Sequence, residues 1–311
     1  MATASSAVAE ALTRFHAGEK IDEPPATPKP APAATKKLSR VVYKTSTGDL
    51  YYARKIPGAA HDVDMLLKAR GATPSESLHT LFHGNPGTGK TSCAMAAFPD
   101  AIIIPGDKDT TVDDFIGQWV QNPDGTYGWV DGPAIIAAEE GRVLIVDEIA
   151  QIPTGILPVL YPLADGRGEL LVKTNPKRGR IKAAPGFFLV GTCNPKAPGA
   201  RMSEAMLSRF SIHIEATTDY DLAKSMGVPA KIVTAAKNLA TKSANNEVGY
   251  TLEMRELLAF KRNAERMNTD FAVANIIGTA PEADRAIVAD VVSRAFGSPI
   301  APLRQGEAAT E

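Results

Sequence analysis

The chain has 311 residues, with 34 lysines and arginines against 35 aspartates and glutamates and a formal net charge of −1. This balance argues against a protein that coats polyanions, while a hydrophobic fraction of 44% is ample for a core and the length suggests about two domains. Cys93 and Cys193, the two cysteines, have neither disulfide nor zinc-finger spacing, so we expect buried reduced thiols. The N-terminus lacks the apolar stretch of a signal peptide or spanning helix, which predicts a cytoplasmic protein without membrane contact.

The N-terminal part of the chain divides into a tail and a hairpin. Residues 1–37 are rich in alanine, serine and proline and cannot bury enough surface to fold, which predicts a disordered tail. Apolar segments on either side of Ser46-Thr47-Gly48-Asp49 predict a small hairpin over residues 41–52. A short helix is expected from Asp62 to Arg70.

Residues 84–91 have the sequence Gly-Asn-Pro-Gly-Thr-Gly-Lys-Thr, which is the Walker A pattern of a phosphate-binding loop. A short apolar strand over residues 78–83 precedes it and an alanine-rich helix over residues 91–98 follows, so the local context fits the motif. Lys90 is expected to contact the β- and γ-phosphates of ATP, and Thr91 is expected to hold Mg²⁺. The predicted nucleotide-binding residues of this segment are Gly84, Asn85, Pro86, Gly87, Thr88, Gly89, Lys90, Thr91 and Ser92. The segment from Arg54 to Ile56 is a candidate for contact with adenine, as in many ATPases of this kind.

A second apolar strand is expected over residues 101–104. The segment near residues 119–130 places Asn-Pro-Asp-Gly between apolar flanks, which predicts a hairpin that interrupts a helix. That helix is expected to restart at Pro133 and to end at Gly141.

Residues 143–148 form an apolar strand that ends in two carboxylates, the Walker B pattern. Asp147 is expected to hold Mg²⁺ directly or through water, opposite Thr91. Glu148 is expected to orient and deprotonate the attacking water. A metal ligand beside a positioned base favours hydrolysis over phosphoryl transfer to a metabolite.

A helix is predicted from Pro153 to Leu163, followed by a second hairpin near residues 170–184. This hairpin carries five cations that form either a solvated turn or a loop that grips a substrate. They are Lys173, Lys177, Arg178, Arg180 and Lys182.

The next strand, residues 187–191, delivers Asn194 to a position suited to contact with the γ-phosphate or the water. Ser203 is expected to cap a short helix that runs to Arg209, and residues 211–214 form the fifth strand. The segments from Asp219 onward have helical periodicity. The predicted helices there are Asp221–Met226, Ala230–Ser243, Glu253–Met267 and Ala283–Phe296.

The predicted fold is therefore α/β, with a five-stranded parallel sheet between helices over residues 38–217. An all-helical lid domain is expected over residues 218–296, and a flexible tail over 297–311.

Five motifs in this order resemble those of AAA+ ATPases, and more narrowly those of the MoxR-type and dynein-related group. They are HGNPGTGKT, DDFIG with VDGPA, VDEI, GTCNP and MLSRF, within about residues 50–296. The group includes the small subunit of cobaltochelatase and the activases of rubisco and nitric oxide reductase. Asn85 departs from the usual pattern, in which small residues or proline are commoner, and this leaves the function of the loop intact.

The resemblance implies roles for three further residues. Asn194 falls on sensor 1, the polar residue that contacts the γ-phosphate. Arg209 falls on the arginine finger that reaches the γ-phosphate bound by a neighbouring subunit, with Arg201 as a competitor for that role. Arg255 falls on sensor 2, a lid residue at the nucleotide. The resemblance also implies a homo-oligomeric ring, most often a hexamer, in which the two hairpins line the central pore.

Several functions remain open at this stage. The first is a Mg²⁺-dependent ring ATPase that remodels or activates a partner, as MoxR-type proteins do with proteins bearing a von Willebrand A domain. The second is the ATPase subunit of a metal chelatase, which shares every motif. A nucleic-acid translocase, gripping phosphates with the basic hairpin, is opposed by the near-neutral charge. A nucleotide kinase is opposed by Glu148 and the helical lid.

Overall fold

The computed structural model describes residues 40–305. The tail predicted at 1–37 lies outside the described residues, as do the last six residues of the tail predicted at 297–311.

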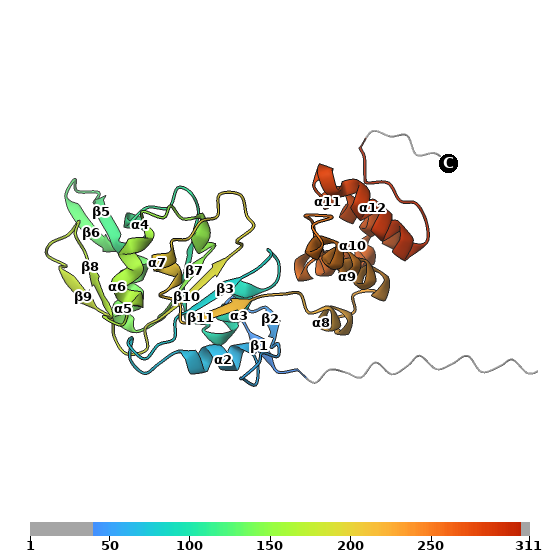
Figure 1. The fold of residues 1–311 in the computed structure, drawn as a ribbon. Coiled ribbons are helices and arrows are strands. Elements are labelled where there is room, and N and C mark those ends of the chain that lie inside the picture. The colour runs from blue at the N-terminus through green and yellow to red at the C-terminus, as the bar shows by residue number, and fades with distance from the viewer. Residues whose placement is uncertain (1–39, 306–311) are drawn as a thin grey trace, which may run out of the picture. The chain divides into compact units, whose positions relative to one another are not determined.

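The centre of the fold is a parallel sheet of five strands (Figure 1). In spatial order they are β11 (Ile212–Glu215), β3 (Thr80–His83), β10 (Phe188–Cys193), β7 (Val143–Asp147) and β4 (Ile102–Pro105). The predicted α/β class with a five-stranded parallel sheet is confirmed.

Helices cover both faces of this sheet. They include α2 (Asp62–Ala69), α3 (Lys90–Ala97) and α5 (Pro133–Glu140). In β7, Val143 and Ile145 belong to a hydrophobic cluster with α2 and α3, whereas Leu144 and Val146 belong to a cluster with α5. Because alternate side chains of a strand point to opposite faces, a strand covered on both sides must be apolar throughout. This explains why the core strands of this chain are continuous apolar runs.

The order of the strands sets where polar groups gather. Strand β10 lies between β3 and β7, with Cys193 opposite His83 and Gly191 opposite Val146. All three strands are parallel, so their carboxyl ends share one edge of the sheet. The loop after β3, the last residue of β7 and Asn194 after β10 therefore meet at that edge.

Three antiparallel hairpins extend from the sheet, each where the sequence predicted one. They are β1 (Val42–Lys44) with β2 (Leu50–Tyr52), β5 (Gly117–Gln121) with β6 (Tyr127–Asp131), and β8 (Glu169–Leu171) with β9 (Arg180–Lys182). The short helix α4 (Asp113–Ile116) leads into β5. The indole Nε1 of Trp119 donates to the carbonyl of Thr174 at 3.2 Å, so the second and third hairpins touch.

After β11 the described chain is helical. Its helices are α8 (Tyr220–Ser225), α9 (Ala230–Ala244), α10 (Met254–Arg266), α11 (Thr269–Thr279) and α12 (Glu282–Phe296). Their apolar residues form a hydrophobic cluster of their own. The domain boundary that we place between residues 217 and 218 remains a prediction.

Two details of the sequence-based assignment are wrong. The helix predicted from Pro153 to Leu163 is replaced by a 3₁₀ turn, η2 (Leu157–Leu160), and the one-turn helix α6 (Tyr161–Ala164). Pro158 and Pro162 lie within this segment and lack the N–H groups that a continuous α-helix needs. Helix α11 was not predicted, because its apolar residues are spread around the helix and show no amphipathic period.

Two short elements complete the described part of the chain. They are the 3₁₀ turn η1 (Ile149–Gln151) and the helix α7 (Glu204–Leu207). No helix among residues 40–305 has the length and apolarity that a membrane crossing requires.

Candidate functional site

The glycine-rich loop joins the end of β3 to the start of α3, and its shape depends on glycine. Gly84 has a φ of 142°, and a Cβ on it would lie 2.4 Å from the carbonyl oxygen of Ala216. Gly87 has a φ of 80°, and a Cβ on it would lie 2.8 Å from the Cβ of Arg255. A larger residue at position 84 or 87 would push the loop away from Ala216 or Arg255.

Lys90 is the first residue of α3, and its side chain folds back into the loop. Its ammonium donates to the carbonyls of Gly84 and Asn85, both at 3.0 Å. The side chain is 5% exposed, and burial lowers the pKa of Lys90. The hydroxyl of Thr88 donates to the same Asn85 carbonyl at 2.9 Å, which stiffens the loop around the cation. Ser92 lies exposed in the first turn of the helix.

Thr91 and Asp147 come together from α3 and β7. The hydroxyl of Thr91 donates to Oδ1 of Asp147 at 2.6 Å. Thr192, on the adjacent strand β10, donates its hydroxyl to the same carboxylate oxygen. One carboxylate and one hydroxyl are hard oxygen donors of the type that Mg²⁺ takes when phosphates and water complete its shell. Thr91 and Asp147 therefore fit the expected metal.

Glu148 has an unusual backbone conformation next to this pair. Its φ of 48° and ψ of 39° place it in the left-handed region, which a non-glycine residue rarely occupies. Its N–H donates to the hydroxyl of Thr192 at 3.2 Å, so Thr192 contacts both residues of the acidic pair. Strained residues of this kind cluster at functional sites.

Asn194 lies at the same edge of the sheet as Glu148. Both line a cavity of about 460 Å³ that also includes Pro86 of the loop and Gln151. The side-chain oxygen of Asn194 accepts from the N–H of Lys196 at 3.1 Å, which leaves its amide nitrogen available to a ligand. The structure thus brings the phosphate loop, the acidic end of β7 and the side-chain amide of Asn194 together.

Arg255 lies beside the loop. Its side chain is exposed, and its backbone N–H donates to the carbonyl of Gly87 at 3.3 Å.

Arg209 is held at a different place in the same chain. Its guanidinium stacks on the ring of Tyr161, 3.9 Å from the centroid, and lies 3.8 Å from Asp165. It also donates to the carbonyl of Ala205. None of these partners belongs to the phosphate loop or to β7. Arg201, the competitor, is exposed, and its backbone N–H donates to the carbonyl of Ala150 at 2.8 Å.

The basic hairpin is partly neutralised within the chain. Arg178 contacts Asp131 at 3.0 Å and Glu139 at 2.8 Å, and Arg180 pairs with Glu169. The remaining three cations of the hairpin are exposed. They are Lys173, Lys177 and Lys182. Two of the five cations that were predicted to form either a solvated turn or a loop that grips a substrate are thus paired with carboxylates of the same chain.

Two residues near the loop have contacts that the sequence did not predict. The signal for Thr192 is weak: it lies two positions before Asn194, and residues two apart along an extended chain point to the same side. Arg54 was suggested as an adenine contact, but its guanidinium donates to backbone carbonyls of Thr88, at 2.8 Å, and Thr217, at 3.1 Å.

A glycine-rich loop between a buried strand and a helix, with a threonine–aspartate pair at its base, defines a phosphate-loop nucleotide-binding domain. Residues 79–210 match the family model described as the AAA domain of the dynein-related subfamily. The resemblance inferred from the motifs is confirmed at this level.

Relatives match over part of their length. The denitrification regulatory protein NirQ of Stutzerimonas stutzeri is 37% identical over 28% of this chain and 30% of its own. Protein NorQ of Paracoccus denitrificans is 33% identical over 40% of this chain and 46% of its own. The chain thus spans less than half the length of these relatives. The structure of a candidate ATPase from Cytophaga hutchinsonii covers 66% of this chain and 73% of its own at 16% identity, with a TM-score of 0.41, which is too low to bear on function.

Proposed function

We propose that this protein is a Mg²⁺-dependent ATPase that converts ATP and water to ADP and phosphate. The observation that carries the proposal is the Thr91–Asp147 hydrogen bond of 2.6 Å, next to Glu148 and at the base of the loop that holds Lys90. Bound magnesium would neutralise charge on the β- and γ-phosphates. Lys90 would then turn from the loop carbonyls to the phosphates, and Glu148 would orient the attacking water and accept its proton.

Glu148→Gln tests this proposal. The variant should bind ATP as the natural protein does, because the amide keeps the shape of the side chain, but phosphate release should fall by about 10²–10⁴-fold since the base is lost. Nucleotide titration and a phosphate-release assay measure the two properties. Glu204→Gln, at an exposed position on α7, is the matched control. Unchanged turnover in Glu148→Gln would remove Glu148 from the role of base.

We further propose that the active form is a homo-oligomeric ring, with six subunits as the expected number, in which Arg209 contacts the γ-phosphate bound by the neighbouring subunit. The support is that Arg209 is held by Tyr161 and Asp165, away from the loop of its own chain. An arginine supplied in trans accelerates phosphoryl transfer by about 10³–10⁵-fold.

Mixing two inactive variants tests the ring. Arg209→Ala and Glu148→Gln should each be almost inactive. Together they should regain activity, because an interface between an Arg209→Ala site and a Glu148→Gln neighbour has both groups intact. Arg201→Ala should remain active in the same assay. Full turnover in Arg209→Ala would contradict the arrangement and favour Arg201.

For the biological role, we propose remodelling or activation of a partner protein, with a von Willebrand A domain protein as the expected partner. The name of the relative NirQ describes a regulatory protein, which supports action on a protein. The ATPase subunit of a metal chelatase is the alternative. Purifying Glu148→Gln in its ATP-bound form, followed by mass spectrometry of bound proteins and of ring size, separates the two roles.

A further inference from the structure

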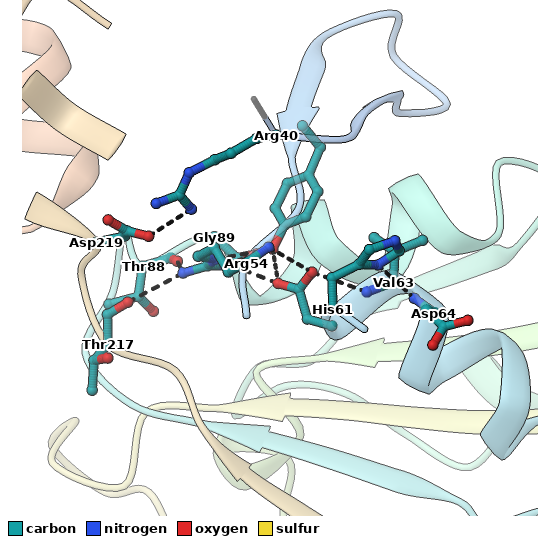
Figure 2. Close-up of polar contacts among 11 residues, drawn as sticks. Arg40, Arg54, His61, Val63, Asp64, Thr88, Gly89, Thr217 and Asp219 are labelled. Carbon is teal, nitrogen blue, oxygen red and sulfur yellow. Dashed lines mark hydrogen bonds and ion pairs between the residues drawn. The ribbon is translucent and has the colours of Figure 1, made fainter. Parts of the chain in front are cut away.

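Arg54 joins the phosphate loop to the chain that leads out of the sheet. One terminal nitrogen of its guanidinium donates to the carbonyl of Thr88, at 2.8 Å, and to that of Thr217, at 3.1 Å (Figure 2). The other terminal nitrogen lies 3.4 Å from the carbonyl of Gly89. Thr88 and Gly89 form the last turn of the loop, and Thr217 follows the last strand of the sheet. A single side chain therefore contacts both segments.

The guanidinium is itself held in place by buried groups. Its side chain is 17% exposed, and its Nε and one terminal nitrogen lie 3.1 and 2.8 Å from the hydroxyl of Tyr51. That hydroxyl donates to Asp62 at 2.5 Å, and Asp62 also accepts from the N–H of Arg54 at 3.0 Å. A planar guanidinium fixed in this way contacts several acceptors at little cost in side-chain entropy.

Asn85 anchors the opposite end of the loop. Its amide nitrogen donates to Oε1 of Glu253 at 2.7 Å and to the hydroxyl of Thr251 at 3.1 Å. Glu253 is the N-cap residue of α10 and is 7% exposed. The amide at position 85, where small residues or proline are commoner in Walker A loops, therefore has a specific partner in the helical region.

Hydrogen bonds lead from the two anchors to adjacent residues of the segment after β11, from Arg54 directly and from Asn85 through Glu253. Arg54 contacts the carbonyl of Thr217, and the hydroxyl of Thr218 donates to the second carboxylate oxygen of Glu253. Thr218 also accepts from the N–H of Met254 at 3.2 Å, which fixes the start of α10. Residues 216–219 link β11 to α8, and two of them are connected to the phosphate loop: Thr217 directly through Arg54, and Thr218 through Glu253, which Asn85 contacts.

We propose that Arg54 and Asn85 are positioning residues that make the conformation of the phosphate loop and the attachment of the helical region depend on each other. The inference rests on the proposed ATP binding at the loop. Any ligand that fixes the loop would then also fix residues 216–220, since a free-energy coupling between two sites acts in both directions. Neither residue needs to touch the nucleotide through its side chain.

Arg54→Lys is the test, and Arg70→Lys is its matched control. Lysine keeps the charge but lacks the planar fork, so it cannot hold the same set of carbonyls. Arg70 also caps two backbone carbonyls, those of Gly186 at 2.7 Å and Gly141 at 2.9 Å, but neither belongs to the loop. Arg54→Lys should weaken ATP binding about tenfold. Arg70→Lys should lower the melting temperature and leave ATP affinity unchanged.

Hydrogen exchange gives a readout that does not require activity. In the protein without nucleotide, Arg54→Lys should raise exchange both in residues 84–91 and in residues 216–220, and Asn85→Ala should do the same. With ATP bound, protection of residues 216–220 should appear in the natural protein and be reduced in both variants. Increased exchange confined to residues 84–91, or an equal loss of ATP affinity in Arg70→Lys, would overturn the proposal.

The outcome also separates this inference from the proposed function. If the natural protein fails to bind ATP, the proposed function is wrong, and the exchange comparison without nucleotide still decides whether the two segments are coupled. If ATP binds and residues 216–220 respond alike in all three proteins, the coupling is wrong and the ATPase proposal stands.

Discussion

The hydroxyl of Thr91 and the carboxylate of Asp147, 56 positions apart in the sequence, meet at 2.6 Å where α3 begins and β7 ends. Two separate motifs thereby become one site. Both groups offer oxygen, and the loop that would hold the phosphates, which starts at Gly84, ends at Thr91.

Asp147→Asn should weaken the effect of Mg²⁺ on nucleotide affinity, because an amide is a poorer ligand for a hard cation than a carboxylate. We expect affinity for ATP with Mg²⁺ to fall roughly tenfold, with little change in EDTA. Titration with a fluorescent ATP analogue in both buffers measures this. Asp131→Asn, whose carboxylate pairs with Arg178, is the control. An equal loss with and without Mg²⁺ would contradict a metal role for Asp147.

Thr192→Val should impair catalysis more than binding. Thr192 is fully buried, and its hydroxyl donates to Asp147 and accepts from the N–H of Glu148. Valine keeps the shape but leaves that N–H without its acceptor, which releases the strained backbone of Glu148. We expect turnover at saturating Mg²⁺ and ATP to fall about tenfold while affinity changes less than about threefold.

The control for Thr192→Val is a second threonine of the same sheet. Thr80 of β3 is also fully buried, but its hydroxyl donates to the carbonyl of Leu78 at 3.0 Å, away from the acidic pair. Thr80→Val should therefore retain turnover. Equal losses in the two variants would mean that Thr192 acts only through stability.

The parts of the site that could be predicted are those encoded by neighbouring residues. The loop at residues 84–91 is a continuous motif, and its glycines indicate the backbone shape directly. Asp147 and Glu148 were predictable because they directly follow an apolar run that predicts a strand, which places them at its carboxyl end. The meeting of these segments follows from parallel strands that share an edge.

Contacts that depend on register or on distant segments could not be predicted. Thr192 reaches Asp147 only because β10 pairs with β7 in one register. Arg54 lies in a segment without periodicity, and nothing in its neighbours indicates that it would contact Thr217. The pairing of Arg178 with Glu139 is likewise set by the position of the hairpin against α5. Local sequence patterns determine where helices and strands form, whereas these contacts depend on how distant segments pack against one another.

His79 should make stability depend on pH. It is 2% exposed, it lies against Phe187 and Phe188, and burial lowers its pKa to about 4. Its neutral ring accepts from the N–H of Leu189 at 3.1 Å. The unfolded chain, with a histidine pKa near 6.5, binds a proton that the native state excludes, so stability falls as pH drops below 6.5. Between pH 8 and pH 5 the loss should be about 2 kcal/mol.

Urea unfolding at pH 8 and pH 5 measures this loss. His79→Gln should show a smaller difference between the two pH values, since the titrating group is gone. His213→Gln, at an exposed position on β11, should behave as the natural protein. An unchanged difference in His79→Gln would assign the acid sensitivity to other groups.

Ile277→Ala tests whether residues 218–296 unfold as a domain. Ile277 of α11 is fully buried in the cluster of the helical region, and its truncation should cost about 2–5 kcal/mol. Both tryptophans of the chain, Trp119 and Trp129, lie in the β5–β6 hairpin, so their fluorescence reports on the sheet-containing part. Without nucleotide, the helical signal in circular dichroism should unfold at lower urea in Ile277→Ala while the tryptophan transition stays in place. Met267→Ala, which changes a side chain that is 62% exposed, should shift neither transition. If both transitions move together in Ile277→Ala, the sheet and the helices form one cooperative unit and the boundary between residues 217 and 218 is wrong.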